Sequence, residues 1–192
     1  MTNVLFQIFS LLLQVPALVI FLVIILLNSG VLQFRDMPWI IVTLVHLSLL
    51  PLLYGAFVYK TKRISDSEIM TRQERVLPFF IITFIYGVYL LETIFFHAPI
   101  IFNTLAIHCF ILALLLSTIT IFWKVSVHTA GITQFVALLA ILIGSQALIL
   151  SPLIVLTGWL RIHMKSHDIW QVLGGIMVAL MSILVATQIS PP

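Results

Sequence analysis

The stretch that decides the fold of this chain is Thr133–Leu160, TQFVALLAILIGSQALILSPLIVLTGWL. It is apolar except around Gly144–Gln146, a sequence typical of a break between two helices. As one helix, this run would place the residues before it and after it on opposite faces of a membrane. As two helices, it would return both to the same face. We favour the hairpin. If its first helix starts near Ser126 and its second ends near Arg161, each half has roughly sixteen residues, which is a short but workable span at ~1.5 Å per residue.

The whole chain has the composition of a membrane protein. Its 192 residues are 62% hydrophobic and only 8% charged, and apolar stretches long enough to cross ~30 Å of hydrocarbon recur along it. The sequence lacks the alternation of apolar and polar residues that marks barrel strands, which leaves a helical bundle as the way to pair the backbone in lipid. The first apolar stretch is longer than a signal-peptide core and lacks a basic start, so it reads as a membrane helix. We expect an all-α, polytopic transmembrane bundle of six to seven helices that forms one integral membrane domain, 1–192.

Outward from the hairpin, short polar or turn sequences separate the apolar segments. The expected segments are Asn3–Leu27, Pro38–Tyr59, Pro78–Phe95, Pro99–Trp123, the two halves of the hairpin and Ile169–Ile189. With seven segments, the connections 60–76, 124–128 and 161–168 emerge on one face, and they hold every Lys and Arg except Arg35. The positive-inside rule would make that face cytoplasmic, although phosphate-binding residues would produce the same asymmetry. The expected location is a bacterial cytoplasmic (inner) membrane.

Ionisable residues gather in Gly158–Gly175, GWLRIHMKSHDIWQVLGG. Charged groups beside hydrocarbon are costly, so such a cluster indicates a functional site. The segment Lys124–His128 and the loop 60–76 would share its face, and the loop contributes Arg72 and Arg75. Guanidinium groups three residues apart face the same way on a helical turn and suit phosphate oxygens. The alternative is that this loop only fixes the topology.

Two histidines among fixed cations, without a matched carboxylate pair, suit phosphoryl transfer. A neutral imidazole can attack phosphorus, and a second, protonated one can give a proton to the leaving oxygen. Permanent cations stabilise the charge on the equatorial oxygens. The only adjacent carboxylate, Asp168, offers no oxygen-rich cage, so we expect no metal and no other cofactor. The net charge of +3 comes from few residues and indicates phosphate or anionic lipid as a partner rather than nucleic acid.

These motifs resemble those of the type-2 phosphatidic acid phosphatase superfamily, the lipid phosphate phosphatases. Arg161 and His167, with five residues between them, are similar to the third signature of that family, SRxxxxxHxxxD. Ser126-Val127-His128-Thr129 resembles the second, PSGH followed by a small or hydroxyl residue, and precedes a hairpin as in the family. The stretch from Thr71 to Pro78 is loosely similar to the first, KxxxxxxRP.

The resemblance spans Arg72–Gly175 and implies a phosphatase-like core at about 60–189. Its implied activity is metal-independent hydrolysis of a lipid phosphate or prenyl diphosphate through a phosphohistidine intermediate. By that resemblance His167 is the nucleophile and His128 the general acid. The implied phosphate ligands are Arg161, Lys124, Arg72, Arg75 and Ser126, the last through its hydroxyl or its backbone amide at a helix start.

The chain departs from these signatures at several positions. Gln171 stands where the final aspartate of the family orients the nucleophile, and an amide can set the tautomer but cannot stabilise an imidazolium as a carboxylate does. The other replacements are Val125 and Val127 for the proline and glycine of PSGH, Leu160 for the serine before the arginine, and Met70 and Leu77 in the first signature. Either the cations are repositioned in a divergent branch, or catalysis is lost. We favour catalysis, because Arg161 and both histidines remain.

Two other functions are compatible with the sequence: a non-catalytic lipid-binding relative, and a haem protein. Haem would require two histidines facing each other on adjacent helices, drawn from His46, His108, His128 and His167. A single histidine such as His46 in an apolar helix is more often a hydrogen-bonded core residue. Glu92 and His97 beside a turn, together with the deeper His108, are expected to pair with one another, and His163 and Lys165 to lie at the membrane surface.

Overall fold

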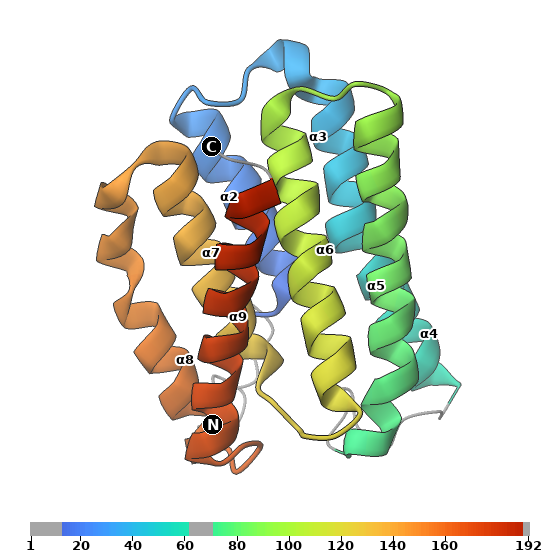
Figure 1. The fold of residues 1–192 in the computed structure, drawn as a ribbon, viewed down its shortest axis with the longest axis vertical. Helices are drawn as coiled ribbons and strands as arrows, with labels where there is room; N and C mark the ends of the chain where they lie inside the picture. Colours follow the sequence, from blue (N-terminus) through green and yellow to red (C-terminus); the bar gives the residue numbers. More distant parts are fainter. Residues whose placement is uncertain (1–12, 62–70, 190–192) are drawn as a thin grey trace.

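The computed structural model describes residues 13–61 and 71–189, which form a bundle of helices (Figure 1). Expected helix residues 3–12 and most of the loop 60–76, with Met70, lie outside the described residues. Every regular element within the described ranges is helical. The elements are α2 (Val15–Asn28), η1 (Phe34–Asp36), α3 (Met37–Leu44), η2 (Val45–Leu49), α4 (Leu50–Lys60), α5 (Arg72–Phe95), α6 (Ile100–Thr120), α7 (Val127–Ile143), η3 (Ser145–Leu150), α8 (Pro152–His163) and α9 (Ile169–Ile189).

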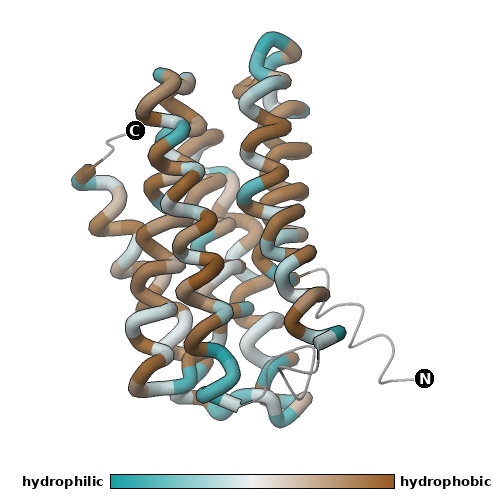
Figure 2. The backbone as a smooth tube through the Cα atoms, turned by 90° about the vertical axis from the view of Figure 1, so that its right-hand side faces the viewer, coloured by the Kyte–Doolittle hydropathy of each residue, from teal (hydrophilic) through white to brown (hydrophobic). Residues whose placement is uncertain are grey.

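Five helical stretches are long and apolar enough to cross a membrane. They are Phe34–Lys60, Arg72–Phe95, Ile100–Thr120, Ser145–His163 and Ile169–Ile189. Two shorter apolar helices, α2 and α7, pack among them. Hydrophobic residues cover the lengths of the helices and hydrophilic ones gather toward their ends (Figure 2). The chain is therefore an all-helical integral membrane protein.

The predicted break in Thr133–Leu160 is confirmed. Helix α7 ends at Ile143, and Gly144 takes a φ of 104°, a conformation that favours glycine because it has no Cβ. The short helix η3 follows, and Pro152 then stands at the start of α8, where its missing N–H costs nothing. The chain thus reverses, and the loop before α7 and the loop between α8 and α9 lie at the same end of the bundle (Figure 1).

Helix α5 begins at Arg72 rather than at Pro78, where the sequence analysis placed its start. A proline removes one backbone donor and does not by itself begin a helix, and Pro78 is buried inside α5. Arg72 and Arg75 consequently lie on the first turn of a helix, with fixed directions. The second span contains a π-helical turn, η2, that the sequence did not predict, in which the Leu50 amide donates to the Val45 carbonyl just before Pro51.

A polar pair lies toward the other end of the bundle and is called here the distal pair: His46 on η2 and Glu92 on α5. The Nδ1 atom of His46 is 3.0 Å from the Val42 carbonyl oxygen, and its Nε2 atom is 3.5 Å from Oε2 of Glu92. Its ring stacks on Tyr89. The expected core role of His46 is confirmed. The expected pairing of Glu92 with His97 is wrong, because Glu92 faces the second span and His97 occupies a turn with a φ of 51° beyond the end of α5.

Candidate functional site

His167 lies in the short loop between α8 and α9, and hydrogen bonds fix its position. Its backbone amide donates to the Arg161 carbonyl at 3.2 Å, which folds the loop back onto the end of α8. Its Nδ1 atom is 2.8 Å from Oε1 of Gln171, one turn along α9. An amide oxygen only accepts, so Nδ1 carries the hydrogen and the lone pair lies on Nε2. Gln171 therefore sets the tautomer that a nucleophilic histidine needs.

Asp168 does not replace the aspartate that is missing at position 171. Its Oδ1 atom accepts the Gln171 backbone N–H at 2.8 Å, which caps the first turn of α9. The side chain is exposed and supports the backbone from outside the site. The only side-chain partner of the His167 ring among the described residues is thus a neutral amide.

The starts of α7 and α9 are locked together beside His167. The Ser126 amide donates to the Gln171 carbonyl at 3.0 Å, and the Thr129 hydroxyl is 3.2 Å from the Val172 carbonyl. A Cβ at Gly175 would collide with the Ser126 carbonyl and the Thr129 hydroxyl, so only glycine permits this approach. The lock holds the helix that carries His128 against the helix that follows His167.

This lock excludes one of the two phosphate contacts expected of Ser126, the one through its backbone amide. Its backbone amide is already bonded to Gln171, so it is not available to a phosphate. Its hydroxyl accepts the Thr129 N–H at 3.4 Å as the N-cap of α7, and the residue is fully buried. Ser126 therefore supports the backbone around the site. Its hydroxyl accepts an amide of the first turn of α7, and its own amide donates to a backbone carbonyl of α9.

Buried cations from two different helices act on His167. Arg161, in the last turn of α8, is 2% exposed, and Arg75, on α5, is 3% exposed. One Nη of Arg75 donates to the Val125 carbonyl at 3.3 Å, which ties α5 to the start of α7. Burying guanidinium groups is expensive. Their convergence from separate elements indicates a site built for negative charge.

The pKa of His167 reflects its burial and the positive charges around it. Burial of the ring and then the charge of Arg75 lower the pKa of His167 to about 3. The bond to Gln171 opposes the shift, whereas Arg161 and Lys124 add to it. Burial, Arg75 and Arg161 also lower the pKa of Lys124. The imidazole of His167 is consequently neutral at physiological pH.

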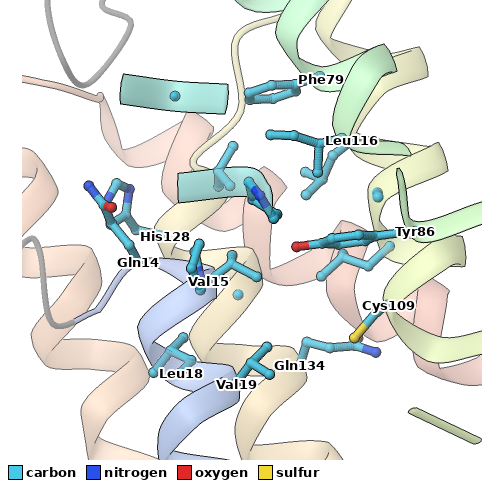
Figure 3. Close-up of a pocket in the computed structure, with 18 of the residues that line it drawn as sticks. Gln14, Val15, Leu18, Val19, Phe79, Tyr86, Cys109, Leu116, His128 and Gln134 are labelled. Carbon is cyan, nitrogen blue, oxygen red and sulfur yellow. The ribbon is translucent and has the colours of Figure 1, made fainter. Parts of the chain in front are cut away.

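A cavity of about 380 Å³ begins at this site and continues into the apolar part of the bundle. The basic residues in its lining are His167, His128 and Arg75, and α2, α4, α5, α6 and α7 supply its mostly apolar walls. Figure 3 shows His128 and Gln14 on one side of this cavity and Tyr86 and Cys109 on the other. The arrangement suits an amphipathic molecule with an anionic end.

The structure does not bring every predicted ligand to this cavity. Arg72 donates to the Ile121 carbonyl at 3.0 Å and to the Phe122 carbonyl at 2.8 Å, in the turn directly after α6, where carbonyls lack helical partners. It is absent from the cavity lining, and so are Lys124 and Arg161, which act on His167 through their charge. His163 and Lys165 are exposed and do not line the cavity, and their expected position at the membrane surface stays a prediction.

A buried polar network at the wall of the cavity, centred on the lining residue Gln134, was missed from sequence. The Gln134 amide donates to the His108 carbonyl at 3.3 Å and lies 3.4 Å from the His108 Nδ1 atom. The Ser182 hydroxyl donates to the side-chain amide oxygen of Gln134 at 2.9 Å. A lone Gln in an apolar helix was the available signal. The histidines proposed for haem are thereby divided: His46 pairs with Glu92, His108 with Gln134, and only His128 and His167 share a cavity.

Together, the fold and the site define a polytopic helical membrane protein with a cation-surrounded histidine at the mouth of an apolar cavity. Comparisons of the chain with models of protein families, with curated proteins and with solved structures found no match. The functional argument therefore rests on the geometry of the site.

Proposed function

We propose that this protein is a membrane-embedded phosphatase that hydrolyses a lipid phosphate or prenyl diphosphate without a metal ion, through a phosphohistidine at His167. The observation that carries the proposal is the neutral His167, with Nδ1 held by Gln171, at the polar end of an apolar cavity that Arg75 also lines. Buried Arg161 adds its positive charge to His167 from outside the cavity lining. The cavity supports a lipid rather than a soluble substrate. The motif resemblance to the type-2 phosphatidic acid phosphatases points to the same chemistry.

In the proposed reaction, the Nε2 lone pair of His167 attacks phosphorus, and the bond from phosphorus to the lipid oxygen breaks. His128, in its protonated form, gives its proton to the leaving oxygen. His128 then takes a proton from water, which attacks the phosphohistidine and releases inorganic phosphate. Arg75 and Arg161 stabilise the charge on the equatorial oxygens, which is the task that a metal performs in other phosphoryl-transfer enzymes.

The proposed topology has all seven apolar segments crossing the membrane, with α2 and α7 as short spans in a bacterial cytoplasmic membrane. The phosphate site would then lie at one interface, at the end of the bundle that holds the start of α5, the loop before α7 and the loop between α8 and α9 (Figure 1). Thiol labelling of cysteines introduced at Thr61 and Lys165 in intact cells tests this arrangement, and equal accessibility of the two positions is expected.

One alternative has an observation in its favour. Gln171 gives His167 a neutral partner, which suits a relative that binds a lipid phosphate without cleaving it. The deciding test is phosphate release by the purified protein, with a chelator present, from a lipid monophosphate and a prenyl diphosphate. We expect release by the wild-type protein, its loss in His167→Ala, and an acid-labile phosphoenzyme that only the wild type forms.

Equal release by wild type and His167→Ala would refute the nucleophile assignment. Binding of the lipid without release would establish the non-catalytic alternative. An absorbance scan of the same preparation covers the remaining alternative, because a Soret band would reveal haem and contradict the phosphatase proposal.

A further inference from the structure

The cavity is open to the surroundings along one helix. Four of its lining residues are exposed at the molecular surface, and all four lie on α4: Leu52, Gly55, Ala56 and Tyr59. The lining residues from α2, α5, α6 and α7 are buried or half-buried. The mouth of the cavity therefore lies along α4, within the stretch Phe34–Lys60 that is apolar and long enough to span the membrane.

Among the described residues, no neighbouring helix fills the centre of this mouth at Gly55. Apart from the adjoining residues and backbone of α4 itself, a Cβ placed there would meet no described atom within 4 Å, although the residue lines the cavity. The neighbouring lining residue, Ala56, is also small. A span that otherwise carries Leu52 and Tyr59 thus has a gap of low side-chain volume facing the hydrocarbon.

The cavity has the dimensions and polarity of a seat for one lipid tail. Along α5 its lining runs from Arg75 to Tyr86, a rise of about 16 Å at 1.5 Å per residue, which is near half of the ~30 Å hydrocarbon thickness. One end carries Arg75 and His167, and the remainder is mainly apolar. A volume of about 380 Å³ is at the small end for ligand pockets, which suits a single chain.

From these observations we infer that the opening along α4 at Gly55 is a lateral portal through which one hydrocarbon tail of a lipid phosphate passes from the bilayer into the cavity. The phosphate reaches Arg75 and His167 at the interface while the tail lies between α2, α5, α6 and α7 (Figure 3). This inference deepens the proposed function and rests on it for the identity of the phosphate end. Its ligand is an amphiphile with an anionic head and an alkyl or prenyl chain.

The test is binding of dodecylphosphonate, which cannot be hydrolysed, to the full-length protein in nanodiscs. In Gly55→Trp the indole fills the portal, and displacing even two methylene groups from the cavity weakens binding by about tenfold or more. The matched control is Leu53→Trp, on the same helix, which is exposed and absent from the cavity lining, and it should bind as the wild type does. Equal affinity of Gly55→Trp and wild type would overturn the portal.

A second variant guards against a folding defect in Gly55→Trp. In Gly55→Cys the bulky group is added after folding by a thiol reagent, and wild-type protein treated in the same way controls for Cys109. Modification should weaken dodecylphosphonate binding, and preloaded ligand should slow the modification. Unchanged binding after complete modification would overturn the inference.

Hydrolysis separates this inference from the proposed function. We expect Gly55→Trp to lose hydrolysis of a lipid monophosphate and to keep hydrolysis of tailless phenyl phosphate. If the wild type binds dodecylphosphonate through the portal but hydrolyses neither compound, the portal stands and the phosphatase proposal fails. If Gly55→Trp hydrolyses both compounds as the wild type does, the portal fails and the phosphatase stands.

Discussion

Two histidines in this bundle share a local arrangement and differ in charge environment. In His167 and in His46, Nδ1 faces a neutral oxygen four residues away, from the Gln171 side chain in one case and the Val42 backbone in the other. Cations surround the first ring, whereas the second faces the carboxylate of Glu92 at 3.5 Å. Helix neighbours therefore set the tautomer in both places, and distant residues set the charge. A neutral ring beside cations suits a nucleophile, and a ring beside a carboxylate suits a structural ion pair.

Removing each ring in turn gives the largest expected contrast. His167→Ala should reduce phosphate release from a lipid phosphate by more than ~10³-fold, because the attacking atom is lost. His46→Ala should leave the rate unchanged and lower thermal stability, because it removes only the distal pair. Steady-state release and a thermal melt of both variants measure the contrast, and equal loss of activity in both would erase it.

Arg75→Gln tests whether the cations make the difference between the two rings. We expect the rate to fall by ~10²–10³-fold, as for loss of one preorganised charge at a transition state. The pKa of His167 should rise, because the field of Arg75 lowers it. Arg72→Gln is the matched control on the same helical turn, and it should affect the rate far less because Arg72 caps α6. An NMR titration of His167 and a rate assay decide the matter.

Gln171→Glu would give His167 the kind of partner that His46 already has. A carboxylate of the same length raises the pKa of the ring and stabilises the imidazolium that forms on attack, so the acid limb of the pH–rate profile should move upward by about one unit or more and the rate should rise. The measurement is the pH–rate profile of the variant beside wild type. An unmoved limb would mean that the partner at 171 only orients the ring.

The smallest expected effect is on stability in acid. The pKa of His167 is about 3 in the folded protein and ~6.5 in the unfolded chain, so between these values the unfolded chain binds the extra proton. The contribution of the neutral His167 ring to stability is complete above pH ~6.5. The free energy of unfolding then falls as the pH drops toward 3, by at most about 1.4 kcal/mol per pH unit. Melting temperatures of wild type and His167→Gln over this range report the effect, and it should shrink in the variant. Parallel curves would contradict the buried neutral ring.

The reversal between α7 and α8 was predictable because its signal is local. Gly144 marks the reversal in an apolar run, and the reversal follows directly from a backbone conformation that favours glycine. The start of α5 was not predictable in this way. Pro78 reads as a helix start in sequence, whereas Arg72 begins the helix, and the Arg72 side chain bonds to carbonyls of α6 about fifty positions along the chain.

The candidate site was also predictable from the sequence only in part. Motifs that resemble those of the lipid phosphate phosphatases singled out Arg161, His128 and His167 as candidates, because the spacing of such motifs can be read directly along the chain. That spacing did not show that the Ser126 amide is bonded to Gln171 or that Gly175 allows this contact, since both depend on how closely α9 approaches α7. Gln134 was missed because its hydrogen-bond partners lie on α6 and α9.

The sequence by itself determined that this chain is an all-helical membrane protein, where it reverses, and which end collects the cations and two histidines. Apolar length, helix breaks and charge count are properties of segments, and the bilayer acts on segments one at a time. Only the tertiary structure decided which cations surround His167, that Arg72 and Ser126 support the backbone around the site, and that a cavity opens along α4 at Gly55. Those outcomes depend on packing between helices distant in sequence, where burial and close approach set both pKa and space.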